Sequence, residues 1–166
     1  MNVVVKGSEV SFNNDTFFNC VFGKNGFTSG KVEGDEKTPL GLFAIEKIYF
    51  RSDRVQSFVS IYNLIPINKD DGWCDDVNSE YYNQFIKLPF GESHEELWRE
   101  DELYDIIVVL DYNTNPVTKG KGSAIFMHVA KENMQYTKGC IAMKKQDLIA
   151  LLGMLDSTDI KVEIRA

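Results

Sequence analysis

The stretch AIFMHVAKENMQYTKGC, residues 124–140, places one histidine and one cysteine twelve positions apart. His128 closes an apolar run that has the length and composition of a buried strand. Cys140 follows the turn-like sequence Thr137-Lys138-Gly139 and leads into a second apolar run, Ile141-Ala142-Met143. We therefore expect both reactive side chains at the ends of neighbouring strand-like segments, which raises the question of whether they work together.

The composition is typical of one globular domain spanning residues 1–166. The chain is 43% hydrophobic and 26% charged, and its length suffices to bury a core without disulfides. A net charge of −7, with no basic patch, argues against nucleic acid and anionic membranes as partners. No run approaches the roughly 20 apolar residues that a membrane span requires.

The N-terminal sequence MNVVVKGSEVSF predicts a first strand and not a signal peptide, because Lys6 and Gly7 interrupt the valines. Cys20, Cys74 and Cys140 show no paired spacing that would indicate disulfides. This is typical of a protein in a reducing compartment or of one whose function uses a free thiol. We therefore expect a cytoplasmic protein; an export signal preceding this segment would make it periplasmic. These residues predict no oligomeric state.

Short β-branched and aromatic runs predict a mostly β fold. Four leucines between Leu148 and Leu155, at helical spacing, predict one amphipathic helix. The sequence Ser93-His94-Glu95-Glu96 fits a capping box and predicts a short helix over 94–100. Residues 66–92 have no clear period and predict a long functional loop with at most one short helix. Strands are expected at 2–6, 9–12, 16–22, 42–50, 57–65, 106–110 and 160–164.

Cys140 is the best candidate for a nucleophile. Gly139 allows close approach of a substrate and leaves the amides of Gly139 and Cys140 free to bind an oxyanion. His128 is the expected base, because the other histidine, His94, lies in a charged segment expected at the surface. Cys74 sits among aspartates that disfavour a thiolate, and the third cysteine is expected in the core. A catalytic Cys140 is expected to react well below the ordinary thiol pKa of about 8.5.

Motifs for metals and phosphates do not occur in the sequence. There is no C-x-x-C, H-x-x-x-H or H-E-x-x-H pair, and residues 68–76 do not follow the calcium-loop pattern. Residues 26–32 are one position short of a phosphate loop and lack the hydroxyl residue after the lysine. We therefore expect neither a metal site nor a cofactor.

Two blocks of sequence resemble the L,D-transpeptidase catalytic domain, also called the YkuD family. His128 followed by Thr137-Lys138-Gly139-Cys140 is similar to the family's histidine and [Ser/Thr]-x-Gly-Cys motif. Gly30-Lys31 followed by Thr38-Pro39-Leu40-Gly41-Leu42-Phe43 is similar to its Gly-Lys and Thr-Pro-x-Gly-x-Phe pattern. The blocks occur in the family's order and span residues 23–152. Lys138 and Ala142 stand where the family commonly has a histidine and an arginine or asparagine.

The resemblance implies an L,D-transpeptidase-like β-sandwich or irregular barrel with a few short helices, and acyl transfer on peptidoglycan stem peptides. Cys140 would attack the carbonyl of the L-centre before the terminal D-alanine, and His128 would take the thiol proton. The amides of Gly139 and Cys140 would bind the oxyanion. A cytosolic enzyme would meet soluble muropeptides, which favours an L,D-carboxypeptidase. The alternatives are an exported transpeptidase that forms cross-links and a non-catalytic module that binds peptidoglycan fragments.

Candidate contacts to the peptide lie in two places. Thr137 and Lys138 precede the nucleophile in the motif. The loop over 73–83 is either a cap over the peptide or a packed insertion, and both interpretations stay open. As a cap it would contribute Trp73, Asp75, Tyr82 and Asn83.

Overall fold

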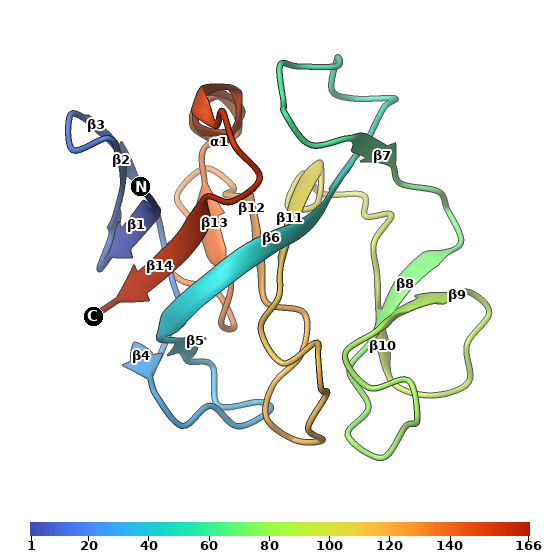
Figure 1. The fold of residues 1–166 in the computed structure, drawn as a ribbon. Helices are drawn as coiled ribbons and strands as arrows, with labels where there is room; N and C mark the ends of the chain where they lie inside the picture. Colours follow the sequence, from blue (N-terminus) through green and yellow to red (C-terminus); the bar gives the residue numbers. More distant parts are fainter.

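Strand β11 (Ile106–Leu110) is an interior strand of the main sheet, and all five of its residues are buried. A strand covered on both faces is expected to be apolar throughout, as this one is. β11 pairs antiparallel with β6 (Gly41–Phe50) on one side and with β12 (Phe126–Val129) on the other. The computed structural model describes residues 1–166 and is organised around these three strands (Figure 1).

Eleven further strands complete three sheets. They are β1 (Val3–Lys6), β2 (Glu9–Phe12), β3 (Thr16–Asn19), β4 (Phe27–Thr28), β5 (Thr38–Pro39), β7 (Leu64–Pro66), β8 (Asp71–Cys74), β9 (Phe85–Lys87), β10 (His94–Glu96), β13 (Ile141–Met143) and β14 (Lys161–Arg165). The main sheet has the order β13-β12-β11-β6-β14-β1-β2-β3, and β7 pairs with β6 outside this path. The other two sheets are β10-β8-β9 and β4-β5.

The main sheet closes almost completely into a barrel. Its edges are β13 and β3, and after β3 the chain returns so that Val21 pairs with Ala142 of β13. The Val21 N–H donates to the Ala142 carbonyl at 2.9 Å, and the Ala142 N–H donates to the Val21 carbonyl at 3.0 Å. The next carbonyl, that of Phe22, accepts from Thr137 N–H at 2.8 Å. The returning segment therefore also supports the turn that carries Cys140.

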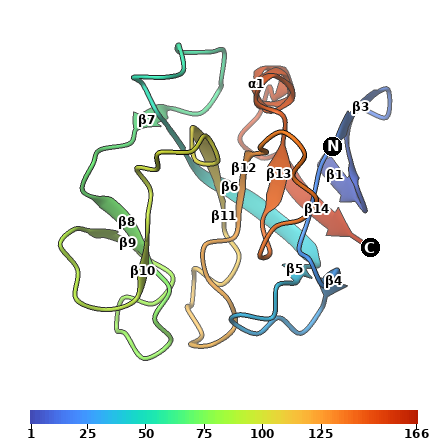
Figure 2. The same cartoon turned by 180° about the vertical axis from the view of Figure 1, so that it is seen from behind.

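The β10-β8-β9 sheet stands apart from the barrel, on the side of β11 away from β1 (Figures 1 and 2). A second, smaller apolar cluster joins the two parts. Within it, the Trp73 ring meets the Phe126 ring edge-on, with 5.1 Å between centroids, and Tyr49 stacks on Phe85 at 5.8 Å. We call the β10-β8-β9 sheet the side wall.

The only helix, α1 (Lys145–Met154), lies against β12 and buries Leu148, Leu151 and Leu152, as the leucine spacing predicts. It is ten residues long, and no helix of the protein has the length and apolar character to cross a membrane. The expectation of a mostly β, barrel-like fold is confirmed. The few short helices reduce to this one.

The helix expected over 94–100 is wrong. His94–Glu96 form β10, which pairs antiparallel with β8. The Ser93 hydroxyl, expected to cap a helix, instead donates to the Asp75 carboxylate at 2.6 Å. Pairing with a strand about twenty residues earlier outweighs the local capping pattern.

Two other expectations need correction in the middle of the chain. Of residues 57–65, only the last two join a sheet, through β7, and Val59 and Ile61 are exposed. The segment 66–92 contains the β8–β9 hairpin and no helix. In addition, the strand expected over 16–22 ends at Asn19. In these segments the strands pair with the neighbouring strand along the chain, and this pairing sets where each strand begins and ends.

Candidate active site

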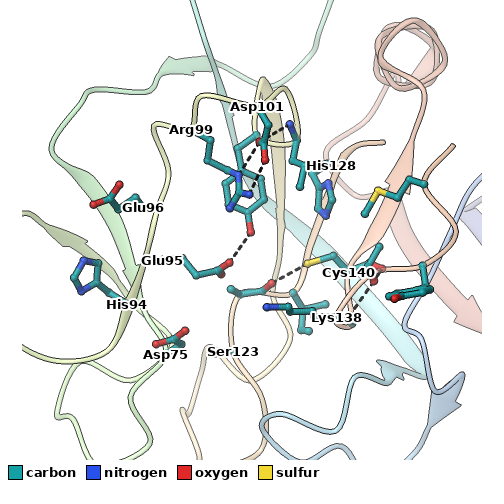
Figure 3. A pocket seen from close by; sticks show the side chains of 18 of the residues that line it. Asp75, His94, Glu95, Glu96, Arg99, Asp101, Ser123, His128, Lys138 and Cys140 are labelled. Carbon is teal, nitrogen blue, oxygen red and sulfur yellow. Dashed lines mark hydrogen bonds and ion pairs between the residues drawn. The ribbon is translucent and has the colours of Figure 1, made fainter. Parts of the chain in front are cut away.

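His128 and Cys140 lie on the same face of two neighbouring parallel strands. The pairing of β12 with β13 sets His128 opposite Ala142, so Cys140, two positions earlier, lies level with Phe126. Because side chains alternate between the faces of a sheet, Cys140 and His128 project to the same side. A hydrogen bond from Phe126 N–H to the Cys140 sulfur, 3.4 Å long, confirms this register. Figure 3 shows both side chains turned into one cleft.

The Cys140 thiol is neutral at rest. Its hydrogen is donated to the carbonyl oxygen of Ala124, 3.1 Å from the sulfur. Burial raises the pKa of the thiol to about 12; the charge of Glu95 adds to the rise, and Lys31 opposes it. Burial therefore opposes the expected reaction of the thiol well below its ordinary pKa, and a titration of thiol alkylation against pH tests that expectation. The nucleophile must lose its proton as it attacks.

His128 is also neutral, and its tautomer is fixed. Its Nδ1 lies 2.9 Å from the carbonyl oxygen of Val129, so Nδ1 carries the hydrogen and Nε2 keeps a free lone pair. Burial lowers the pKa of the imidazole to about 4. The ring packs edge-on against Tyr104, with 5.4 Å between ring centroids. A backbone carbonyl, and not a carboxylate, therefore orients the base.

The turn before Cys140 is held from both sides. The Thr137 hydroxyl accepts from Gly139 N–H at 3.0 Å and donates to the Cys140 carbonyl at 2.6 Å. The Thr38 hydroxyl donates to the Gly139 carbonyl at 2.9 Å. Gly139 has a φ of +144°, and a Cβ there would lie 2.9 Å from the Lys37 carbonyl oxygen. The Thr-Pro block of the sequence thus supports the nucleophile directly.

Only one of the two expected oxyanion donors is free. The amide of Gly139 already donates to Thr137, so the expectation that it is available is wrong in this conformation. The amide of Cys140 donates to no group in the protein. Gly139 therefore acts by allowing the backbone conformation, and the Cys140 N–H is the donor that a developing oxyanion can reach.

The pair opens into a cleft of about 1250 Å³ between the barrel and the side wall. Three of the predicted contact residues, Asp75, Thr137 and Lys138, line it. Thr137 is buried with its hydroxyl used within the turn, whereas Lys138 is exposed beside the nucleophile. The charged residues of the lining are Lys31, Glu33, Asp75, Glu95, Glu96, Arg99, Glu100, Asp101 and Lys138.

Trp73, Tyr82 and Asn83 are absent from the cleft lining, and all three are buried. The Trp73 Nε1–H donates to the Asn83 carboxamide oxygen at 3.0 Å, and that oxygen also accepts from Ala124 N–H at 2.9 Å. The Tyr82 hydroxyl donates to Glu33 at 2.8 Å. These side chains fasten the side wall to the barrel, so their burial favours the interpretation of a packed insertion over that of a cap.

Glu95 and Tyr104 are cleft residues that the sequence did not indicate. Glu95 sits in the segment whose pattern predicts a helix cap, and Tyr104 lies in a short turn before β11. The Tyr104 hydroxyl donates to a Glu95 carboxyl oxygen at 2.9 Å, and burial raises the pKa of both groups. No local motif marks them, because they meet through the pairing of β10 with β8.

A thiol, a neutral imidazole and a free backbone amide at one end of an open cleft can carry out acyl transfer through a thioester. The sequence model of the L,D-transpeptidase catalytic domain, YkuD, matches residues 2–164. The chain belongs to this family. Members of the L,D-transpeptidase family depend on a cysteine and act on peptidoglycan, and this domain is assigned that general function. The comparison with curated proteins found no match.

Proposed function

We propose that this L,D-transpeptidase-family domain is an L,D-carboxypeptidase that removes the terminal D-alanine from soluble muropeptides in the cytoplasm. The observation that carries the proposal is the neutral Cys140–His128 pair beside the free Cys140 amide. A neutral imidazole can accept the thiol proton, and a neutral thiol needs a base.

Acylation follows from these groups. The Cys140 sulfur attacks the carbonyl carbon of the L-centre, and its proton passes to Nε2 of His128. The negative charge on the carbonyl oxygen is stabilised by the Cys140 N–H. When the carbon–nitrogen bond breaks, the imidazolium returns the proton to the departing amine of D-alanine. Water then cleaves the thioester and yields the shortened peptide.

Lys138 supports a substrate with a free carboxylate at its end. Its side chain is exposed at the cleft, directly before Gly139 and Cys140 in the chain. A stem tetrapeptide that ends in D-alanine presents a carboxylate within a few ångströms of the scissile bond. A positive charge at this position favours binding of the tetrapeptide, whose terminal carboxylate is free. In a longer stem peptide the same carboxyl group forms an amide and carries no charge.

The test is mass spectrometry of a meso-diaminopimelate tetrapeptide muropeptide incubated with the wild type and with Cys140→Ala. We expect the wild type alone to remove one D-alanine. Cys20→Ala, which changes a cysteine in the core cluster of the barrel, should retain the activity. A dimer mass would replace the proposal with transpeptidation, and no change with any protein would replace it with a binding role.

The cellular location is tested separately. We expect fractionation of bacteria that express the native gene to recover the protein with cytoplasmic markers. Recovery with periplasmic markers would favour the exported transpeptidase that forms cross-links.

A further inference from the structure

The cleft has a second potential base on the wall that faces Cys140. Glu95 lies on β10 of the side wall, and Figure 3 shows its carboxyl group turned toward the Cys140 sulfur from across the cleft. His128, by contrast, stands on the same sheet as the nucleophile. The two bases therefore approach the reacting sulfur from different elements.

The Glu95 carboxyl is held in place by one hydrogen bond, which occupies only one of its two oxygens. One oxygen accepts the Tyr104 hydroxyl at 2.9 Å, and the other oxygen has no hydrogen-bond partner in the protein. Tyr104 is 6% exposed and packs edge-on against both Phe126 and His128, so it cannot easily move. The free oxygen is consequently presented to the cleft by a rigid support.

We propose that Glu95 is the general base that activates the water molecule that hydrolyses the Cys140 thioester. This inference rests on the proposed carboxypeptidase function and deepens it, because it gives the second half of the reaction its own catalytic residue. A base beside the nucleophile suits the removal of the thiol proton. A base across the cleft suits a water molecule that approaches the exposed face of the thioester.

The Glu95 carboxylate takes one proton from water while the water oxygen bonds to the thioester carbon. The resulting tetrahedral intermediate collapses by breaking the carbon–sulfur bond, which releases the peptide acid and the Cys140 thiolate. The proton on Glu95 then passes to the thiolate, so the neutral thiol and the carboxylate are both restored. Burial raises the pKa of Glu95, which makes its carboxylate a stronger base toward water.

The central experiment compares D-alanine release by the wild type and Glu95→Gln in rapid-mixing kinetics. The carboxamide oxygen of glutamine can still accept the Tyr104 hydroxyl, so the fold is expected to hold. We expect Glu95→Gln to release about one D-alanine per enzyme at nearly the wild-type rate and then to turn over about 100-fold more slowly. Intact-mass analysis should show the shortened peptide attached to the variant.

Rescue and controls sharpen the result. Neutral hydroxylamine needs no base, so it should restore turnover of Glu95→Gln and give a peptide hydroxamate. Tyr104→Phe, which loses the bond to Glu95, should show a smaller defect of the same kind. Glu92→Gln makes the same chemical change on an exposed residue outside the cleft and should behave as the wild type.

The possible outcomes separate the two proposals. If Glu95→Gln slows the first D-alanine as much as later ones, or raises only KM, Glu95 serves acylation or binding and the inference is overturned. Unchanged turnover would also overturn it. If the wild type itself releases no D-alanine, the proposed function fails first and the inference fails with it.

Discussion

His128 is held by the carbonyl of its own neighbour, Val129, and by no carboxylate. A carboxylate partner would raise the pKa of the imidazole, whereas burial, helped by the charge of Arg99 and opposed by the bond to Val129, lowers it to about 4. The result is a base that stays unprotonated over a wide pH range. Its partner thiol stays protonated for the same reason, because both groups lose their hydration together.

The pH dependence of acylation should therefore begin unusually low. The folded pKa of His128, about 4, lies below its ordinary value of 6.5, so the imidazole is protonated and inactive only below about pH 4. We expect the rate of the first D-alanine release to rise through that region and to stay level to neutral pH. Rapid-mixing measurements from pH 3.5 to 8 check this. A rising limb near 6.5 would contradict it.

Gly139 is expected to tolerate no side chain. Its φ of +144° and the 2.9 Å from a built Cβ to the Lys37 carbonyl oxygen both oppose alanine. We expect Gly139→Ala to lower the free energy of unfolding by about 1–3 kcal/mol and to reduce D-alanine release by about 100-fold or more. Urea unfolding and the muropeptide assay measure the two effects.

Gly153 offers the matched control. It lies in α1, and the nearest atom to a built Cβ is 3.6 Å away, an ordinary contact. Gly153→Ala should stabilise the domain slightly, by up to about 1 kcal/mol, and leave activity unchanged. Equal behaviour of the two alanine variants would argue against the backbone role of Gly139.

At the scale of elements, the side wall decides the shape of the cleft. It contributes Glu95 through β10, and it is tied to the barrel by Asn83, whose carboxamide oxygen accepts from both Trp73 and Ala124. Ala124 in turn accepts the thiol hydrogen of Cys140. One buried amide therefore links the wall to the nucleophile.

Trp73→Phe tests whether Trp73 fastens the wall or contacts the peptide. The change removes the bond from Nε1 to Asn83 and keeps an aromatic ring against Phe126. We expect a loss of about 1–2 kcal/mol of unfolding free energy, a fall of several degrees in Tm, and an unchanged KM. Tyr81→Phe, at a half-exposed position on the same segment, should alter neither quantity.

A raised KM with an unchanged Tm would instead restore the substrate-contact interpretation of Trp73. Calorimetry and steady-state kinetics on the same preparations distinguish the two results. The comparison with Tyr81→Phe removes any general effect of losing a polar aromatic group from this segment.

The sequence predicted those elements whose signals are local. The apolar run of β11 and the leucine spacing of α1 needed no information from elsewhere. The motif around Cys140 was enough to predict a pair with His128, and the structure places both side chains on one face of neighbouring strands. The helix predicted over residues 94–100 was wrong because the capping pattern at Ser93 is a local signal, whereas β10 is formed by pairing with β8. Glu95 escaped notice for the same reason, since only tertiary structure brings it to the cleft.

At the scale of the whole molecule, the barrel is closed by the segment after β3, which runs back to pair with β13. Val21 exchanges two hydrogen bonds with Ala142, which lies on β13 directly after the nucleophile turn. The unpaired edge of β13 is thereby covered, and the same contact keeps Cys140 in register with β12. We call this pair of hydrogen bonds between Val21 and Ala142 the seam, and we expect both stability and activity to depend on it.

Val21→Pro should open the seam. Proline has no N–H to donate to Ala142, and the carbonyl left without its partner is buried. We expect the free energy of unfolding to fall by about 1–3 kcal/mol and D-alanine release to fall with it. Val21→Ile, which keeps the N–H, should change neither. Retention of full activity by the proline variant would show that the seam does not support the site.

The bond between the Thr38 hydroxyl and the Gly139 carbonyl joins residues 101 positions apart. During synthesis, Thr38 leaves the ribosome long before Gly139 and Cys140 have been added, so this bond can form only when most of the chain has been made. Activity at Cys140 is therefore expected only from molecules whose chain is nearly complete and folded. For the same reason, a chain cut in the exposed segment between β6 and β7 would place Thr38 and Gly139 on different fragments. Activity at Cys140 would then be measured only after the two fragments associate.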